Sequence, residues 1–320
     1  EASTSMKEIM EGAATPAQIA CFITALRMKG ETVDEITGCA EEMRAHAIRI
    51  HPKTSYLVDT CGTGGDVSNT FNVSTLSAIL AASVGVSIAK HGNRSVSSKS
   101  GSADLLESLG VNINLEPPKV EACIDNVGIG FIFAPLFHQA MKFAMPTRKE
   151  IGIRTIFNIL GPLTNPAGAH AQILGVFKES LTEPMANVLH NLGVREAMVV
   201  HGMDGLDEIS ISDRTKVSHL KDGNVKTYYI KPEDYGIKRS RKEDLVVHSI
   251  EDSKTVALEL LKGHNKGPKR DIVLLNSAAA ITLGKRAKDL KEGIKLAGEA
   301  IDSGKAFKKL EEFVEFTKKG

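Results

Sequence analysis

The sequence of 320 residues contains no tryptophan, and only 5% of its residues are aromatic. Proteins that bind single-stranded nucleic acid depend on basic grooves or on aromatic side chains that stack on the bases. Lys and Arg number 40 against 39 Asp and Glu, so the net charge of +1 supplies no overall field for a polyanion or an anionic membrane. These shortages weaken a nucleic-acid-binding interpretation, and any anion site has to be local.

Cysteines are few and scattered. Cys21, Cys39, Cys61 and Cys123 include no CxxC pair, which argues against a zinc knuckle, a redox motif or the disulfide framework of a secreted protein. We therefore expect thiols in a reducing cytoplasm. The longest apolar stretches, such as residues 76–86, fall well short of the roughly 20 residues that span a bilayer, so no membrane segment or signal peptide is predicted.

Capping signals predict helices across the first fifty residues. Thr15-Pro16-Ala17-Gln18 is a capping box with proline at the first helical position. Thr32 and Glu35 repeat the signal for a second helix that runs to about Arg49. Residues 137–165 also look helical and are punctuated by prolines.

From Ser55 onward, short apolar runs alternate with helical segments. The pattern predicts strands at 56–59, 86–89, 130–133, 172–177 and 197–201, and helices at 74–83, 102–109, 183–192 and 290–301. Such alternation is typical of a parallel sheet. Residues 220–247, around Asp222-Gly223, suggest a peripheral hairpin or loop.

The predicted fold class is therefore α/β, in two parts. A small helical N-terminal domain, residues 1–53 with a returning helical insertion at about 137–166, packs on a larger α/β domain. The larger domain comprises residues 54–136 and 167–320 and has a largely parallel central sheet.

The most informative segment is 59–75, DTCGTGGDVSNTFNVST, a glycine-rich turn between a predicted strand and a predicted helix. Backbone N–H groups in such a turn, with a helix N-terminus behind them, bind phosphate oxygens. The spacing fits neither a Walker sequence nor the dinucleotide fingerprint. Gly62, Gly64 and Gly65 would also permit an unliganded tight turn, but the hydroxyl-rich continuation favours phosphate binding. Ser74 either contacts a metal or caps the helix.

Two further segments follow predicted strands. Segment 90–101, KHGNRSVSSKSG, has the basic and hydroxyl side chains that suit a polyphosphate, although such a run is usually a solvated loop. Asp207 and Glu208 suit Mg²⁺, although an acidic pair alone is more often a surface turn. Open α/β sheets bind ligands at the carboxyl edge that these segments share, so we favour ligand binding for both.

The helical insertion carries Arg154 and His138. Arg154 can bind a carboxylate through two parallel hydrogen bonds, or it can form a salt bridge between the two lobes, and the spacing leaves both open. For His138 we expect an ordinary histidine on a helix surface.

The ordered set GTGGD, NVST, KHGNR, SGSAD, RTIFNILGPLTNP and GLDE resembles the anthranilate phosphoribosyltransferase family over nearly the whole chain. The resemblance implies transfer of a phosphoribosyl group from phosphoribosyl pyrophosphate (PRPP) to anthranilate, giving N-(5-phosphoribosyl)anthranilate and pyrophosphate. This is the second step of tryptophan biosynthesis from chorismate. The resemblance also implies two Mg²⁺ ions per active site and a homodimer joined through the helical domains. No nucleic acid or membrane partner is expected, and association with anthranilate synthase is left open.

Matching motifs then imply a role for each residue. PRPP would be held by Gly62, Thr63, Gly64, Gly65, Asp66, Asn72, Thr75, Lys90, Ser97, Ser98, Lys99, Gly101 and Ser102. The metal ligands would be Ser74, Asp207 and Glu208. Anthranilate would contact Gly62, His91, Asn93, Pro135 and Arg154.

The residues suit this chemistry. Breaking the bond from C1 to pyrophosphate builds oxocarbenium character and releases a highly charged leaving group, which metal ions and backbone N–H groups stabilise. The aromatic amine is already a free base at neutral pH, so orientation can suffice and we assign no catalytic base.

Two other functions compete with this one. A pyrimidine nucleoside phosphorylase resembles the chain in its fold and glycine-rich turn but uses inorganic phosphate; KHGNR and the acidic pair argue against it. A nucleic-acid-binding protein is the second alternative, because basic runs occur at 238–242 and 266–270. Each of these runs lies beside acidic residues or Pro-Gly, as in a solvated loop.

Overall fold

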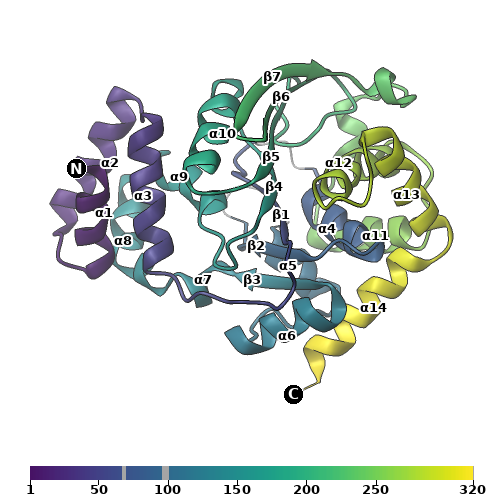
Figure 1. Ribbon diagram of the computed structural model, residues 1–320, viewed down its shortest axis with the longest axis horizontal. Coiled ribbons are helices and arrows are strands. Elements are labelled where there is room, and N and C mark those ends of the chain that lie inside the picture. Colours follow the sequence, from purple (N-terminus) through teal and green to yellow (C-terminus); the bar gives the residue numbers. More distant parts are fainter. Residues whose placement is uncertain (67–69, 96–100, 320) are drawn as a thin grey trace.

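The N-terminal segment forms three helices, α1 (Ala2–Glu11), α2 (Pro16–Lys29) and α3 (Val33–Ala45). They belong to a computed structural model that describes residues 1–66, 70–95 and 101–319 (Figure 1). Both predicted capping boxes are present, because the hydroxyls of Thr15 and Thr32 accept backbone N–H groups in the first turns of α2 and α3. The second helix ends at Ala45 rather than near Arg49. Its chain leaves the helix so that the Ile48 N–H can donate to the carbonyl of Phe137 at 2.9 Å.

A second group of helices returns to these three from the middle of the chain. It consists of α7 (Ala134–Phe137), η1 (Gln139–Phe143), α8 (Met145–Ile151), α9 (Phe157–Leu160) and η2 (Gly161–Leu163). Helix α8 packs on α2, η1 on α1, and α9 on α3. Ile23, Ile156 and Leu160 are fully buried between the two groups. The predicted helical insertion is therefore confirmed.

Among the described residues, seven strands form one sheet in the order β3-β2-β1-β4-β5-β6-β7. They are β1 (Val58–Gly62), β2 (Ile88–Gly92), β3 (Ile129–Phe133), β4 (Ala171–Gly175), β5 (Glu196–Gly202), β6 (Thr215–Lys221) and β7 (Asn224–Ile230). The first five strands run parallel, which confirms the predicted largely parallel sheet.

The predicted hairpin also exists, but it begins earlier and belongs to the main sheet. Strands β6 and β7 add to β5 in antiparallel pairing. Asp222 and Gly223 join them with φ angles of 50° and 74°, the positive values that a two-residue hairpin turn of this kind requires.

Two apolar cores lie on opposite faces of the sheet. Successive residues of β4, Ile173 and Leu174, point to different cores, as the strand period of two dictates. One face is covered by α4 (Val73–Ser83) and α12 (Pro268–Leu283) and the other by α10 (Thr182–Asn191), which also touches α3 (Figure 1). The small helical part thus joins the same core as the second face of the sheet.

The remaining elements surround these layers. They are α5 (Ser102–Ser108), α6 (Pro117–Val127), η3 (Glu179–Leu181), η4 (Pro232–Tyr235), η5 (Lys242–Leu245), α11 (Ile250–Leu261), α13 (Leu290–Asp302) and α14 (Lys305–Lys318). None of the helices in the described part of the chain combines the length and apolar character needed to cross a membrane.

Substitution of two glycines in helix α13 can test how closely α13 packs on α12. A Cβ at Gly293 would lie 2.9 Å from the Cα, Cβ and carbonyl oxygen of Ala278 in α12, and backbone atoms cannot move aside easily. We expect Gly293→Ala to lower the free energy of unfolding by about 1–3 kcal/mol. Gly298 is the matched control, because its Cβ would meet only the Arg270 guanidinium, at 3.8 Å. Gly298→Ala should stabilise the protein by about 0.5–1 kcal/mol.

Urea denaturation of the two variants measures both effects. A Gly293→Ala protein as stable as wild type would contradict the close contact between α12 and α13.

Candidate active site

The glycine-rich turn and the acidic pair meet at the carboxyl edge of the sheet. Strand β1 ends at Gly62, directly beside Gly175 at the end of β4. The next N–H, that of Thr63, donates to the carbonyl of Gly175 at 2.9 Å. The N–H of Gly64 donates to Oδ2 of Asp207 at 2.9 Å, although the two residues are far apart in the sequence. The sheet therefore places these two predicted segments in direct contact.

Glycine is required where these segments cross. A Cβ at Gly175 would lie 1.6 Å from the carbonyl oxygen of Asp207, and one at Gly62 would lie 2.6 Å from Oδ2 of the same residue. Gly64 and Gly65 have φ angles of 62° and 77°, which side-chain-bearing residues rarely adopt. The glycines thus allow a close backbone approach as well as a turn.

The N-terminus of α4 lies next to this crossing. Oδ1 of Asn72 accepts the N–H of Thr75 at 2.9 Å and the hydroxyl of Ser74 at 3.3 Å, so Asn72, not Ser74, caps the helix. Oγ1 of Thr75 is buried and has no hydrogen-bond partner within the described ranges. A buried hydroxyl without a partner at a helix N-terminus favours a site for a polar ligand.

Lys90 lies deeper than the sequence predicted. Strand β2 continues through Lys90 and His91 to Gly92, so both residues are in the strand and not in the loop after it. The side chain of Lys90 is 1% exposed and donates from Nζ to the backbone carbonyl of Thr60 and to Oγ of Ser74 at 3.2 Å. Burial lowers the pKa of Lys90, while Asp59 opposes this by favouring the charged amine. The ammonium group therefore lies beneath the glycine-rich turn.

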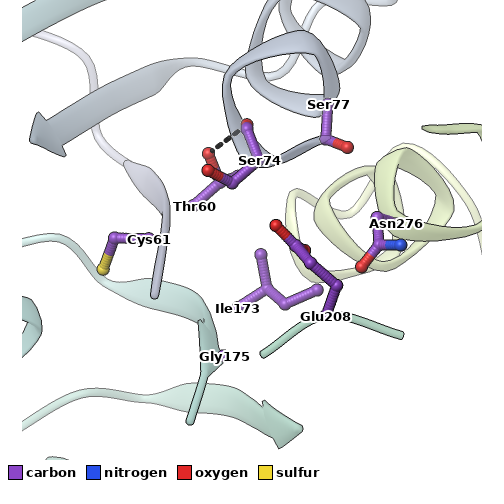
Figure 2. A pocket seen from close by; sticks show the side chains of 8 residues that line it. All are labelled: Thr60, Cys61, Ser74, Ser77, Ile173, Gly175, Glu208 and Asn276. Carbon is purple, nitrogen blue, oxygen red and sulfur yellow. Dashed lines mark hydrogen bonds between the residues drawn. The ribbon is translucent and has the colours of Figure 1, made fainter. Parts of the chain in front are cut away.

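The acidic pair, if both carboxyl groups were ionised, would carry more negative charge than its surroundings balance. Burial raises the pKa of Asp207 to about 7, Asp66 adds to the rise, and the Gly64 N–H opposes it. Burial and the charge of Asp207 raise the pKa of Glu208 well above its usual range. Figure 2 shows Glu208 pointing toward the start of α4, in a small cavity that Ser74, Ser77 and Asn276 also line. A divalent cation would relieve this excess charge.

The donor atoms fit Mg²⁺. The Ser74 hydroxyl and the Asp207 and Glu208 carboxylates are hard oxygen ligands of the kind Mg²⁺ takes. In the described residues no group of three or more His, Cys, Asp or Glu side chains is placed to hold a metal. An ion here would complete its shell with water and substrate phosphate oxygens, as Mg²⁺ commonly does.

Three of the residues expected to contact anthranilate are exposed. Asn93 is exposed just after β2, and Pro135 is exposed at the start of α7. Arg154 is also exposed, donates from Nη2 to the carbonyl of Gly65, and lies over the ring of Phe177 at 4.6 Å. Its contacts among the described residues include no carboxylate, so the salt bridge between the lobes is not formed. The insertion instead brings Arg154 to the glycine-rich turn.

The expectation for His138 was wrong. The chain turns inward at the end of α7, and the His138 side chain is 7% exposed with its ring centroid 5.0 Å from that of His91. Burial lowers the pKa of His138 to about 4, and burial with the nearby His138 lowers the pKa of His91 well below its usual value. Both rings are therefore neutral at pH 7. Each Nε2 atom is buried with no hydrogen-bond partner in the described part of the chain.

Segment 90–101 is described only at its two ends, residues 90–95 and residue 101. Ser97, Ser98 and Lys99 lie outside the described residues. At the flanks, the N–H groups of Ser95 and Gly101 both donate to Oδ2 of Asp104, at 3.0 and 3.1 Å. Gly101 precedes Ser102 as the N-cap of α5.

Three residues that the sequence analysis did not select also support the site. Asp104 joins the two flanks, and its capping-box spacing was the available signal. Asp59 is fully buried and accepts the N–H of His91 at 3.1 Å; an aspartate inside a predicted buried strand was its signal. Asn165 donates to Asp59; it lies within the motif RTIFNILGPLTNP, which did not indicate this contact.

Comparison with known proteins agrees with this geometry. Residues 54–307 match the glycosyl transferase family a/b domain, and residues 1–47 match the helical bundle domain of that family. The anthranilate phosphoribosyltransferase of Acetivibrio thermocellus is 62% identical over 97% of this chain and 89% of its own length. The chain belongs to the anthranilate phosphoribosyltransferase family.

Solved members of the anthranilate phosphoribosyltransferase family have the same fold. The enzyme from Thermus thermophilus matches with a TM-score of 0.93 and 42% identity, over 99% of this chain and 94% of the other. The enzyme from Saccharomyces cerevisiae in complex with PRPP and Mg has a TM-score of 0.90 and 29% identity, over 99% and 93% of the two chains. The same yeast enzyme has also been solved in complex with 4-fluoroanthranilate.

The raised pKa of Asp207 predicts how stability depends on pH without divalent cations. Between the ordinary value of 3.8 and about 7, the unfolded chain loses this proton while the folded protein keeps it. The free energy of unfolding should therefore fall as the pH rises through this window and level off above it. Asp207→Asn should make the fall shallower.

Urea denaturation in EDTA across this window measures the effect. Asp222→Asn in the β6–β7 turn is the control, because Asn tolerates the positive φ of that position. An Asp207→Asn protein with the wild-type pH dependence would contradict the assignment of a raised pKa.

Proposed function

We propose that the protein transfers the phosphoribosyl group of PRPP to the amine of anthranilate, releasing pyrophosphate, as a step of tryptophan biosynthesis. The observation that carries this proposal is the contact between the glycine-rich turn and the acidic pair, where the Gly64 N–H meets Asp207. Phosphate-binding N–H groups and metal-binding carboxylates are thereby adjacent, as a substrate with a metal-bound pyrophosphate requires. Family membership supports the choice of both substrates.

The donor substrate occupies the glycine-rich side of the site. PRPP contacts Gly62, Thr63, Gly64, Gly65, Asp66, Asn72, Thr75, Lys90, Gly101 and Ser102, together with Ser97, Ser98 and Lys99. Ser74, Asp207 and Glu208 would hold two Mg²⁺ ions. The yeast complex with PRPP and Mg supports PRPP and Mg²⁺ as the ligands of this family.

Catalysis depends on stabilising the leaving group. The bond from C1 of the ribose to pyrophosphate breaks with oxocarbenium character, so charge accumulates on the pyrophosphate oxygens. Bound Mg²⁺ would neutralise part of that charge. The N–H groups of the turn and of α4 orient the phosphates, and the amine of buried Lys90 lies beside the start of α4, 3.2 Å from Oγ of Ser74. The protein supplies no nucleophile.

The acceptor site is formed by Gly62, His91, Asn93, Pro135 and Arg154. Arg154 binds the anthranilate carboxylate through its guanidinium group. His91 is kept neutral by burial, so it lines the approach without repelling or attracting charge. The anthranilate amine attacks as a free base, which needs orientation rather than a general base. No residue is assigned as a catalytic base.

The helical part has a second role as a dimer interface. Met28, Phe143, Met145 and Ile153 are large apolar residues on that part, with 84%, 39%, 49% and 51% of their surfaces exposed. A second copy of the chain would cover them. The helical domain comprises residues 1–53 and 137–166, and the α/β domain comprises residues 54–136 and 167–320. The four free cysteines support a cytoplasmic location, and no nucleic acid partner is assigned.

The decay of anthranilate fluorescence tests the transferase activity. The signal should be lost only when PRPP and Mg²⁺ are both present, with a coupled step that removes the product. Because Asp207 and Glu208 would hold the metal, Asp207→Asn with Glu208→Gln should abolish Mg²⁺-dependent turnover.

Asp213→Asn with Glu233→Gln is a matched control, since it removes two carboxylates that bind Arg239 at the surface. Full activity in the Asp207 and Glu208 double variant would overturn the metal assignment. No fluorescence loss with wild-type protein would overturn the transferase and favour phosphorolysis of nucleosides.

Arg154→Ala should raise the KM for anthranilate by about tenfold or more, because a charge-assisted contact to the carboxylate is lost. The KM for PRPP should rise less, since the hydrogen bond of Arg154 to the donor side, among the described residues, is to the Gly65 carbonyl. Arg148→Ala is the control, because Arg148 also lies over an aromatic ring, that of Phe157, at 4.9 Å. Steady-state kinetics with each substrate varied in turn measure the two KM values. An equal rise in both would place Arg154 at the phosphate site.

A further inference from the structure

Strands β1 and β2, which both carry residues of the candidate site, are joined by little backbone pairing. Strand β1 pairs with β4 along its whole length, from Val58 opposite Ala171 to Gly62 opposite Gly175. Its pairing with β2 is confined to Val58 opposite Ile88. Toward the carboxyl edge, where the candidate site lies, the described residues of β1 and β2 form no further backbone pairing.

Side chains satisfy backbone groups that this limited pairing leaves unpaired. Oδ1 of Asp59 accepts the N–H of His91 at 3.1 Å. Nδ2 of Asn165 donates to Oδ2 of Asp59 and to the carbonyl of Ala89, both at 2.8 Å. Nζ of Lys90 donates to the carbonyl of Thr60. The side chains of Asp59, Asn165 and Lys90 therefore replace ladder hydrogen bonds, and we call them the wedge.

The wedge is a buried, hydrogen-bonded network. Asp59, Lys90 and Asn165 are 0%, 1% and 4% exposed. Buried polar networks of this kind hold a defined geometry when every member has a partner. Removing one member leaves a buried backbone donor or acceptor unpaired, which costs as much as a lost hydrogen bond.

The wedge also connects the two halves of the acceptor site. Asn165 lies just after η2, on the segment that returns from the helical insertion to β4. Arg154 is in that insertion, whereas His91 and Asn93 lie at the end of β2 and just beyond it. The hydrogen bonds from Asn165 to Asp59 and from the His91 N–H to Asp59 thus connect the insertion that carries Arg154 with the end of β2.

We propose that Asp59 and Asn165 are positioning residues that hold β1 and β2 apart and so place the end of β2 against the insertion for binding of the acceptor. Paired strands lie about 4.8 Å apart. Asp59 and Asn165 take the place of this direct pairing, so without them the His91 N–H and the Ala89 carbonyl lose their partners and the end of β2 is no longer fixed against the insertion. The role in acceptor binding rests on the proposed function, whereas the splitting of the strands does not.

The experiment compares Asp59→Asn, Asn165→Ala and the double variant with wild type. Glu196→Gln is the matched control, because Glu196 is a buried carboxylate, 6% exposed, at the opposite edge of the sheet, and it accepts from Lys285 and His219. Each single variant should raise the KM for anthranilate by about tenfold, the size expected for one lost buried hydrogen bond, and change the KM for PRPP much less. The KM of the double variant for anthranilate should be no higher than that of the more impaired single variant, because both substitutions break the same link.

Hydrogen exchange of the amides of residues 88–93 supplies a readout that needs no activity. Exchange should be about tenfold faster in the Asp59 and Asn165 variants and unchanged in Glu196→Gln. If Asp59→Asn fails to fold, Asn165→Ser, which replaces the amide with a shorter hydroxyl group, takes its place.

Each result decides one point. An equal rise in both KM values, additive effects in the double variant, or unchanged exchange at 88–93 overturns the positioning role. An inactive wild-type protein with faster exchange in the variants overturns the proposed function but leaves the wedge as the structural link.

Discussion

Two stretches of backbone cross at the carboxyl edge of the sheet with no side chain between them, and the candidate site depends on that crossing. Gly175 lies so close to the carbonyl of Asp207 that even a methyl group would not fit. The same approach lets the Gly64 N–H reach the Asp207 carboxylate. A hydrogen-bond donor suited to phosphate and an acid suited to Mg²⁺ are thereby adjacent before any ligand is bound.

This arrangement is costly for the folded protein and useful for binding. Burial and the charge of Asp66 raise the pKa of Asp207, and burial and the charge of Asp207 raise the pKa of Glu208. Lys90 and the N–H groups of Gly64 and Ser74 oppose these rises, but without a cation the folded chain still retains protons on these acids at pH values where free carboxyl groups have lost them. Perturbed carboxyl groups of this kind are typical of functional sites. In the proposed site, a divalent cation would replace these protons and interact with both carboxylates at once.

The sequence predicted the parts of the site that local rules control. Parallel strands end at one edge, so the glycine-rich turn and Asp207-Glu208 could be placed together from their order along the chain. The strand limits were less accurate: β1 and β2 extend to Gly62 and Gly92, because polar and glycine residues that serve the site still belong to the ladder. The inward turn at His138 could not be predicted, since it depends on packing against His91 and not on its own helix.

The wedge marks the limit of what a single sequence reveals. Asp59, Lys90 and Asn165 come from three segments, and each side chain bonds the backbone of another segment, so no spacing pattern records their meeting. The donor side of the site is different, since it is made largely of consecutive backbone N–H groups and one helix N-terminus. In the proposed function, phosphate recognition therefore depends on short stretches of consecutive residues, whereas acceptor recognition depends on how distant segments are held relative to one another. Substitutions far from the acceptor can for that reason alter its binding while leaving the phosphate side intact.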